Sequence, residues 1–176
     1  MNTTRTALLL LLTAAIAAVA ENPVSGPIQD RVGFPKDYAT RFRILRTVER
    51  DGGLKLVTVY GNNLAAAVTN RAGLPYPNGS VLVMETAGTR KGADGKADRT
   101  PVGGLVREQV LGLHVMRRGA GFGTDYGTKR SGEWEFVEYR ADGSYLTPPA
   151  KSAACAECHI KAGKELDFVF HGAVTP

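Results

Sequence analysis

The sequence predicts a mainly β domain of the α+β class, in which a single antiparallel sheet is accompanied by a few helices on one side. Two observations lead to this fold class. Several segments alternate apolar and polar side chains with the period of two that a strand requires. Short turn sequences join these segments, and strands linked by short turns pair antiparallel, because parallel neighbours need a long crossover.

Three strands and two short helices are expected in the first half of the chain. Pro35 near the first turn of residues 34–38 is typical of a helix start. Asn62 or Asn63 can cap a second helix that runs through Ala72 and ends at Gly73. The expected strands, which flank the turns Asp51-Gly52-Gly53 and Pro77-Asn78-Gly79, cover residues 43–49, 54–60 and 80–86.

A long strand over residues 105–116 is expected between two loops, 88–104 and 117–132, which are rich in Gly and charge. Strict alternation would place Leu113 and Val115 on one face of this strand. Val110 and His114 would then lie on the other face.

The last predicted elements are a strand over 133–140 and a helix over about 150–162. Trp134 and Phe136 would occupy one face of the strand, and Val137 and Tyr139 the other. The helix follows Pro148-Pro149 and holds the only two cysteines of the chain, at positions 155 and 158.

Residues 1–20 have the pattern of a secretory signal peptide. Arg5 lies in a short polar start, residues 7–19 are apolar, and Ala18-Val19-Ala20 is a small-x-small cleavage site. A membrane anchor is the alternative, but the apolar run is shorter than the ~20 residues that a spanning helix needs. We therefore expect export to the periplasm, with residues 21–176 as one domain and no membrane span after cleavage.

The charge of the chain argues against nucleic acid as a partner. The formal net charge is +5, from 22 Lys and Arg against 17 Asp and Glu, and the basic residues are scattered. A nucleic-acid surface would gather them in a block with aromatic residues between. An acidic partner protein is compatible with this charge.

Cys155-Ala156-Glu157-Cys158-His159 matches the c-type haem attachment motif. Cysteines three residues apart in a helix share one face, so both sulfurs can form thioethers with one porphyrin edge. His159 can then bind the iron, which implies one covalent haem c per chain. Three other readings remain: a disulfide, a thioredoxin-like redox pair, which would need more chain after Cys158, and a zinc site with two of the histidines.

Several short motifs in a fixed order resemble the cytochrome P-460 family, which includes the cytochromes c′-beta. The resemblance implies a mainly antiparallel β fold, a homodimer, and a haem bound by a C-terminal motif whose histidine is the proximal ligand. Cytochromes P-460 oxidise hydroxylamine with a haem cross-linked to lysine, whereas cytochromes c′-beta bind nitric oxide or carbon monoxide. The motifs are 34–38, Thr58-Val59-Tyr60, 78–83, Arg90-Lys91-Gly92, Leu111-Gly112-Leu113, Trp134-Glu135-Phe136, 155–159 and 167–170.

Three pocket positions of the enzymes in this family are changed here. The resemblance puts Met84 at the cross-linking lysine, Val57 at a distal arginine and His114 at a distal carboxylate. Met84 and Val57 are therefore expected to contact the haem, Met84 also being a candidate weak axial ligand. His114 is a distal candidate that either binds iron or donates a hydrogen bond to a bound ligand.

These residues predict a periplasmic monohaem c-type cytochrome that binds a small gas, nitric oxide or carbon monoxide, or transfers electrons to a redox partner. The alternative is a hydroxylamine or nitric oxide oxidoreductase in which His114 replaces the lost carboxylate as general base. No catalytic residue is assigned beyond this candidate.

Overall fold

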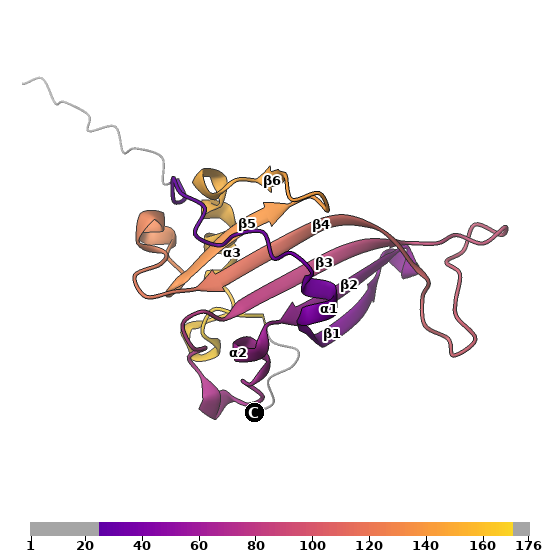
Figure 1. Cartoon of the computed structure of the whole chain (residues 1–176), viewed down its shortest axis with the longest axis horizontal. Coiled ribbons are helices and arrows are strands. Elements are labelled where there is room, and N and C mark those ends of the chain that lie inside the picture. The colour runs from indigo at the N-terminus through magenta and orange to yellow at the C-terminus, as the bar shows by residue number, and fades with distance from the viewer. Residues whose placement is uncertain (1–24, 171–176) are drawn as a thin grey trace, which may run out of the picture.

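The computed structural model describes residues 25–170, which form one six-stranded antiparallel sheet whose strand order follows the chain (Figure 1). This confirms the predicted fold class. The expected signal peptide, residues 1–20, lies outside the described residues. Within 25–170, no helix is long and apolar enough to cross a membrane. The strands are β1 Arg43–Arg50, β2 Lys55–Gly61, β3 Val81–Thr89, β4 Arg107–Arg118, β5 Trp134–Tyr139 and β6 Tyr145–Thr147.

The helices are short. Asn62 caps α2 as expected, because its side-chain oxygen accepts a hydrogen bond from the Ala65 N–H at 3.0 Å. The helix does not continue to Ala72: Asn70 is extended and caps a separate 3-10 turn. The helices are α1 Tyr38–Arg41, α2 Asn63–Ala66 and α3 Ala153–Ile160, and the 3-10 turns are η1 Asp51–Gly53, η2 Arg71–Gly73, η3 Thr124–Lys129, η4 Pro149–Lys151 and η5 Lys164–Leu166.

Both faces of the sheet are covered, each by its own apolar cluster. One cluster joins the sheet to α2, α3 and the segment around Val169. The other joins the opposite face to the N-terminal arm and α1, through Val32 and Tyr38. The prediction that helices lie on one side is therefore wrong for α1. As predicted, Trp134 and Phe136 belong to the first cluster and Val137 and Tyr139 to the second.

A β-bulge in β4 breaks the strict alternation that was expected there. Thr86 pairs with Gly112 but Ala87 pairs with Val110, so Leu111 is left without a partner in the ladder. Val110 is thereby turned to the cluster that contains Leu113, and Leu111 is exposed. A bulge shifts the register by one residue, which reverses the side of Val110, and a second register shift follows between Ala87 and Thr89.

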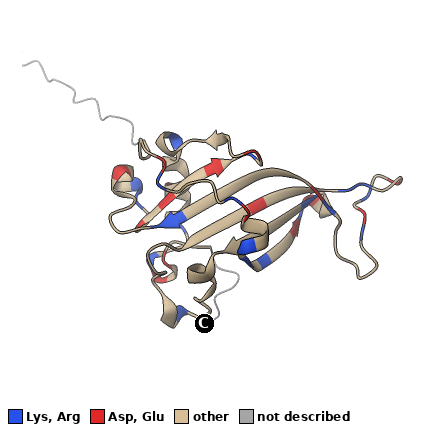
Figure 2. Ribbon diagram, in the orientation of Figure 1, with Lys and Arg blue, Asp and Glu red and all other residues tan. Residues whose placement is uncertain are grey.

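Strand β6 was not predicted, because three residues are too few to show a period. It follows a turn over residues 141–144 and pairs with β5, with Thr147 opposite Glu138. The predicted helix over 150–162 is divided into η4 and α3. The segment between β3 and β4 is the predicted loop. Two isolated antiparallel bridges, between Lys91 and Ala97 and between Arg99 and Leu105, hold its two halves together. It projects from the end of the sheet as a charged arm (Figures 1 and 2).

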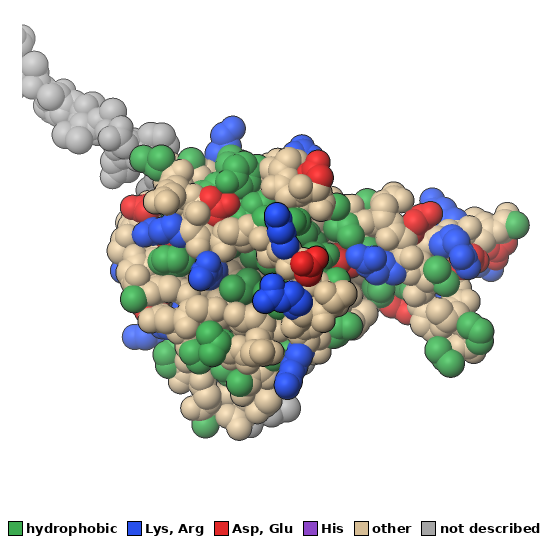
Figure 3. Space-filling view, in the orientation of Figure 1, with side chains coloured by type: hydrophobic (Ala, Val, Ile, Leu, Met, Phe, Trp, Pro, Cys, Tyr) green, Lys and Arg blue, Asp and Glu red, His purple; other side chains and the backbone are tan. Residues whose placement is uncertain are grey.

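Two fully buried carboxylates on the sheet are neutralised by arginine. Arg107 donates to both oxygens of Glu85, at 2.6 and 2.7 Å, and Tyr38 donates to the same group. Burial opposes ionisation of Glu85, but these hydrogen bonds outweigh it and lower its pKa. Glu135 is paired with Arg31 of the N-terminal arm. On the face that Figure 3 shows, the visible Lys and Arg side chains are dispersed and form no dense block.

Candidate functional site

Helix α3 carries the cysteine and histidine side chains to the sheet. Ala153 and Ala156 on this helix are buried in the cluster that contains Trp134 and Phe136. Small side chains let the helix approach the sheet closely, and their burial sets the rotation of the helix about its axis. Cys155, Cys158 and His159 all line the pocket that lies between α3 and the sheet.

The imidazole of His159 is held in one tautomer. Its Nδ1 lies 2.7 Å from the carbonyl oxygen of Phe168, and because a carbonyl can only accept, Nδ1 carries the proton. The ring packs against Phe136 and Phe170, with centroid distances of 4.6 and 5.2 Å. Burial lowers the pKa of His159 and favours the neutral ring. Nε2 is therefore the unprotonated ring nitrogen, and its lone pair can bind a metal.

The Phe168 carbonyl is presented by two residues in the left-handed region, Asp167 at φ 49° and Phe168 at φ 61°. Such backbone is costly for non-glycine residues and persists only where the surroundings hold it. The Asp167 carboxylate accepts from the Tyr76 N–H at 2.9 Å and pairs with Arg118, and its carbonyl accepts from Trp134 Nε1 at 2.9 Å. Sequence reasoning used this segment only as part of a resemblance and missed its role.

The pocket has a volume of about 590 Å³, within the range of cofactor sites. Its walls are mostly apolar. One wall is the sheet and the other is α3 with the segment that follows it. Apart from the α3 residues, the apolar lining includes Val59, Leu82, Met84, Met116, Phe136, Val169 and Phe170.

One row of side chains on the sheet wall of this pocket holds the candidates from the sequence analysis. The strand register pairs Val59 with Met84, Met84 with His114, and His114 with Glu138. Met84 and His114 both line the pocket, and their contact with haem stays a prediction. Val57 does not line it: this residue pairs with Thr86, two positions farther along the ladder, and Val59 takes the place expected for it.

The side chains at the polar end of this row contact one another. His114 Nδ1 lies 2.6 Å from Glu138 Oε1, and the hydroxyl of Thr147 donates to Glu138 Oε2. Glu138 and Thr147 come from strands β5 and β6, and the sequence analysis did not name them. Alternation along 133–140 would have placed Glu138 on the face of Trp134 and Phe136, but its contact with His114 depends on the pairing of three strands.

The two thiols are free and differ in exposure. Cys155 is partly buried, which raises the pKa of its thiol to about 11, while Cys158 is exposed. No disulfide joins them. Among residues 25–170, no three His, Cys, Asp or Glu side chains come together in a group that could hold a metal ion.

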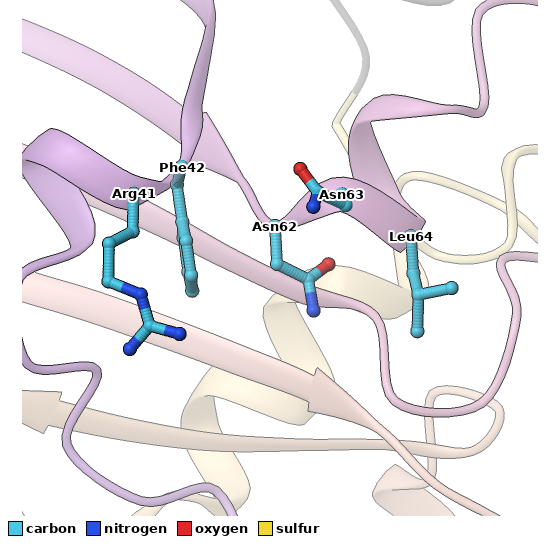
Figure 4. A pocket seen from close by; sticks show the side chains of 5 residues that line it. All are labelled: Arg41, Phe42, Asn62, Asn63 and Leu64. Atoms are coloured by element: carbon cyan, nitrogen blue, oxygen red, sulfur yellow. The ribbon is translucent and has the colours of Figure 1, made fainter.

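A second, smaller pocket of about 280 Å³ lies beside α2 (Figure 4). Its lining residues are Arg41, Phe42, Asn62, Asn63 and Leu64. The Asn62 amide is already used, because it accepts from the backbone at Ala65 and Val81 and donates to the Gly79 carbonyl. This pocket contains none of the residues of the sequence motif.

Comparison with known families places most of the chain in one family. The family model described as Cytochrome P-460 matches residues 35–171, most of the chain. The chain belongs to the cytochrome P-460 family. No curated protein matches the sequence. As a member of the cytochrome P-460 family, the protein is a haem-binding cytochrome, and the matched range includes both α3 and the row of side chains opposite it.

The residues of the larger pocket fit the haem of a cytochrome P-460 protein. An apolar slot suits the faces of a porphyrin, and a neutral imidazole with a free Nε2 suits its iron. Two unpaired thiols stand on the same wall as this imidazole. The smaller pocket offers no comparable donor.

Proposed function

We propose that this protein is a periplasmic monohaem c-type cytochrome that binds a small gas such as nitric oxide or carbon monoxide. Cys155 and Cys158 would hold the haem through thioethers, and His159 would be its proximal ligand. When bound, the haem would supply an iron atom that can bind the gas and can take up or release an electron. The supporting observation is the apolar pocket between α3 and the sheet, which has His159 on one wall and the row from Val59 to Thr147 on the other.

Met84 favours gas binding over hydroxylamine oxidation. It stands in the middle of the sheet row, at the position that the family resemblance gives to the cross-linking lysine. A thioether cannot form the bond that an amine forms. Val59 and Met84 also make this half of the wall apolar, which suits a diatomic gas better than a charged substrate.

Two other functions keep specific support. The pair of His114 and Glu138 would provide a base, which favours an oxidoreductase acting on hydroxylamine or nitric oxide. Met84 as an axial ligand opposite His159 would favour electron transfer.

We further propose export through residues 1–20, a homodimer as in the family resemblance, and a redox partner protein.

Covalent attachment is tested by expressing the full chain with a haem-attachment system. We expect a mass increase of one haem and a haem stain that survives denaturing electrophoresis. Ferrous protein should bind carbon monoxide and shift its absorption band. Recovery of the chain with a Cys155–Cys158 disulfide and no haem would contradict the cytochrome proposal. Ferrous protein that does not bind carbon monoxide would contradict gas binding and favour electron transfer as the function.

A further inference from the structure

A β-bulge in the edge strand β1 turns an arginine to the pocket side of the sheet. Ile44 pairs with Tyr60, and the next pair along the ladder is Arg46 with Val59, so Leu45 is an extra residue. Tyr60 belongs to the apolar cluster on the face away from α3, whereas Val59 lines the pocket. Because directly paired residues point to the same face, Arg46 shares the face of Val59. Bulges often redirect a side chain next to a functional site.

Arg46 extends the row of the sheet wall by one strand. The ladder continues from Glu138 through His114, Met84 and Val59 to Arg46. Opposite residues in neighbouring strands have Cβ atoms about 5 Å apart, so the long side chain of Arg46 can reach the rim of the pocket beyond Val59. Arg46 is exposed, and among the described residues no carboxylate pairs with it. Its positive charge is therefore available to a ligand.

Helix α3 lies over the opposite end of this row. The ring of His159 packs 4.6 Å from that of Phe136 in β5. Burial, and after it the charge of Glu138, raises the pKa of the Cys155 thiol, so this thiol also lies near β5. Thioethers at α3 would therefore hold one porphyrin edge near β5. The two propionates of a haem are on the edge opposite its thioethers, which directs them towards β2 and β1.

We propose that Arg46 binds a haem propionate and thereby fixes the edge of the haem that lies opposite the thioethers. The ligand is a carboxylate, which the planar guanidinium can bind through two parallel hydrogen bonds. The contact is non-covalent, and no proton or electron is transferred in forming it. This inference rests on the proposed haem function of the same pocket.

Other cationic side chains near the pocket are placed less well for a propionate. Lys151 lines the pocket, but it belongs to η4, directly before α3, and so lies at the thioether end. Arg43 pairs with Gly61 on the pocket face of β1. A Cβ added to Gly61 would lie 2.8 Å from Cδ1 of Leu45, so Leu45 fills the space between Arg43 and the pocket. The other titratable groups of the sheet wall, His114 and Glu138, lie on β4 and β5.

The test observes the haem carboxylates directly in the intact haem protein. Haem labelled with ¹³C in its propionate carboxyl carbons gives NMR signals in the diamagnetic ferrous carbonyl form, and their pH dependence yields the pKa of each propionate. A positive charge beside a carboxylate lowers its pKa by roughly 1–3 units, and the exposure of Arg46 favours the low end of this range. We therefore expect Arg46→Gln to raise the pKa of one propionate by about 1 unit.

Arg50→Gln is the matched control. Arg50 lies on the same strand and, four residues along, on the same face, but it pairs with Lys55, beyond Val57, which does not line the pocket. This variant should leave both propionate pKa values nearly unchanged. Circular dichroism shows whether each variant is folded.

Two further measurements distinguish a bound carboxylate from a merely structural arginine. Arg46→Lys keeps the charge but not the planar fork, and should restore most of the wild-type propionate pKa. Arg46→Gln should also lower the reduction potential at pH 7, because a propionate without its positive partner stabilises ferric iron.

The outcomes separate this inference from the proposed function. Equal propionate pKa values in wild type and Arg46→Gln, with haem attached and carbon monoxide bound, would overturn the role of Arg46 alone. A raised propionate pKa in Lys151→Gln in place of Arg46→Gln would put the carboxylate edge beside η4, which also overturns it. Protein without covalent haem would overturn the proposed haem function, and this inference with it.

Discussion

Single side chains decide which chemistry the pocket offers. His159 is prepared for iron because one hydrogen bond, to the Phe168 carbonyl, places the proton on Nδ1. Met84 leaves the middle of the opposite wall without charge, and its thioether cannot form the bond that an amine forms. His114 lies beside it in the ladder and is tied to Glu138. One row of the sheet therefore combines an apolar half with a polar half.

At this scale, the identity of residue 84 should decide the haem spectrum. Wild-type protein is expected to show an ordinary ferrous c-haem spectrum, without the red-shifted band of a cross-linked haem. Met84→Lys places an amine in the same row and should generate that band in part of the molecules. Absorption spectra and the masses of haem peptides check this. Met84→Gln is the control, with a polar side chain that has no nucleophilic amine. A cross-link in wild-type protein would contradict the assignment of Met84.

At the scale of elements, the position of His159 depends on how α3 and the segment after it are anchored. Helix α3 has fewer than three turns, and its position comes from Ala153 and Ala156 against the sheet. The following segment returns to the pocket through two left-handed residues, which Tyr76, Trp134 and Arg118 hold through Asp167. The hydrogen bond to His159 therefore has its origin in contacts made from three different parts of the chain.

Asp167→Ala should weaken this anchor. Loss of the buried carboxylate is expected to lower the free energy of unfolding by about 1–3 kcal/mol. The Phe168 carbonyl should also move from His159, so the iron–histidine stretching frequency of ferrous protein should fall and the reduction potential should rise. Denaturant unfolding, resonance Raman spectroscopy and potentiometry measure these effects.

Glu133→Ala is the matched control for this variant, because Glu133 is the other carboxylate paired with Arg118. It should reduce stability without changing the iron–histidine frequency. The same frequency in wild type and Asp167→Ala would mean that Asp167 stabilises the fold without positioning His159.

At the scale of the whole molecule, the sheet separates two cores with different tasks. The face towards α3 holds the pocket, while the opposite face is sealed by the N-terminal arm and α1. In this second core, the buried Glu85 of β3 links β4 to α1, because its partners Arg107 and Tyr38 come from these two elements. We expect its contribution to be to stability, because Glu85, Arg107 and Tyr38 do not line the pocket.

Glu85→Gln should lower the free energy of unfolding at pH 7 by about 1–3 kcal/mol, a range that allows for the partial exposure of Arg107. The pKa of Glu85 is below its ordinary value of 4.5 in the folded chain. Its stabilisation is therefore present above about pH 4.5 and lost as the pH falls through the lower folded value. The difference between wild type and variant should shrink below pH 4.5 in denaturant titrations. Glu108→Gln, at an exposed position of β4, is the control, and equal pH dependence of Glu85→Gln and wild type would refute the assignment.

The sequence by itself determined the fold class, the five longer strands and the haem motif, because each depends on local patterns of period, turn residues and spacing. Contacts between distant strands are a different matter. The bulge at Leu111, the short strand β6 and the exchange of Val57 for Val59 all depend on register, which local alternation does not encode. The contacts of Glu138 with His114 and Thr147 were likewise decided by the tertiary structure, since contacts across three strands need their pairing to be known.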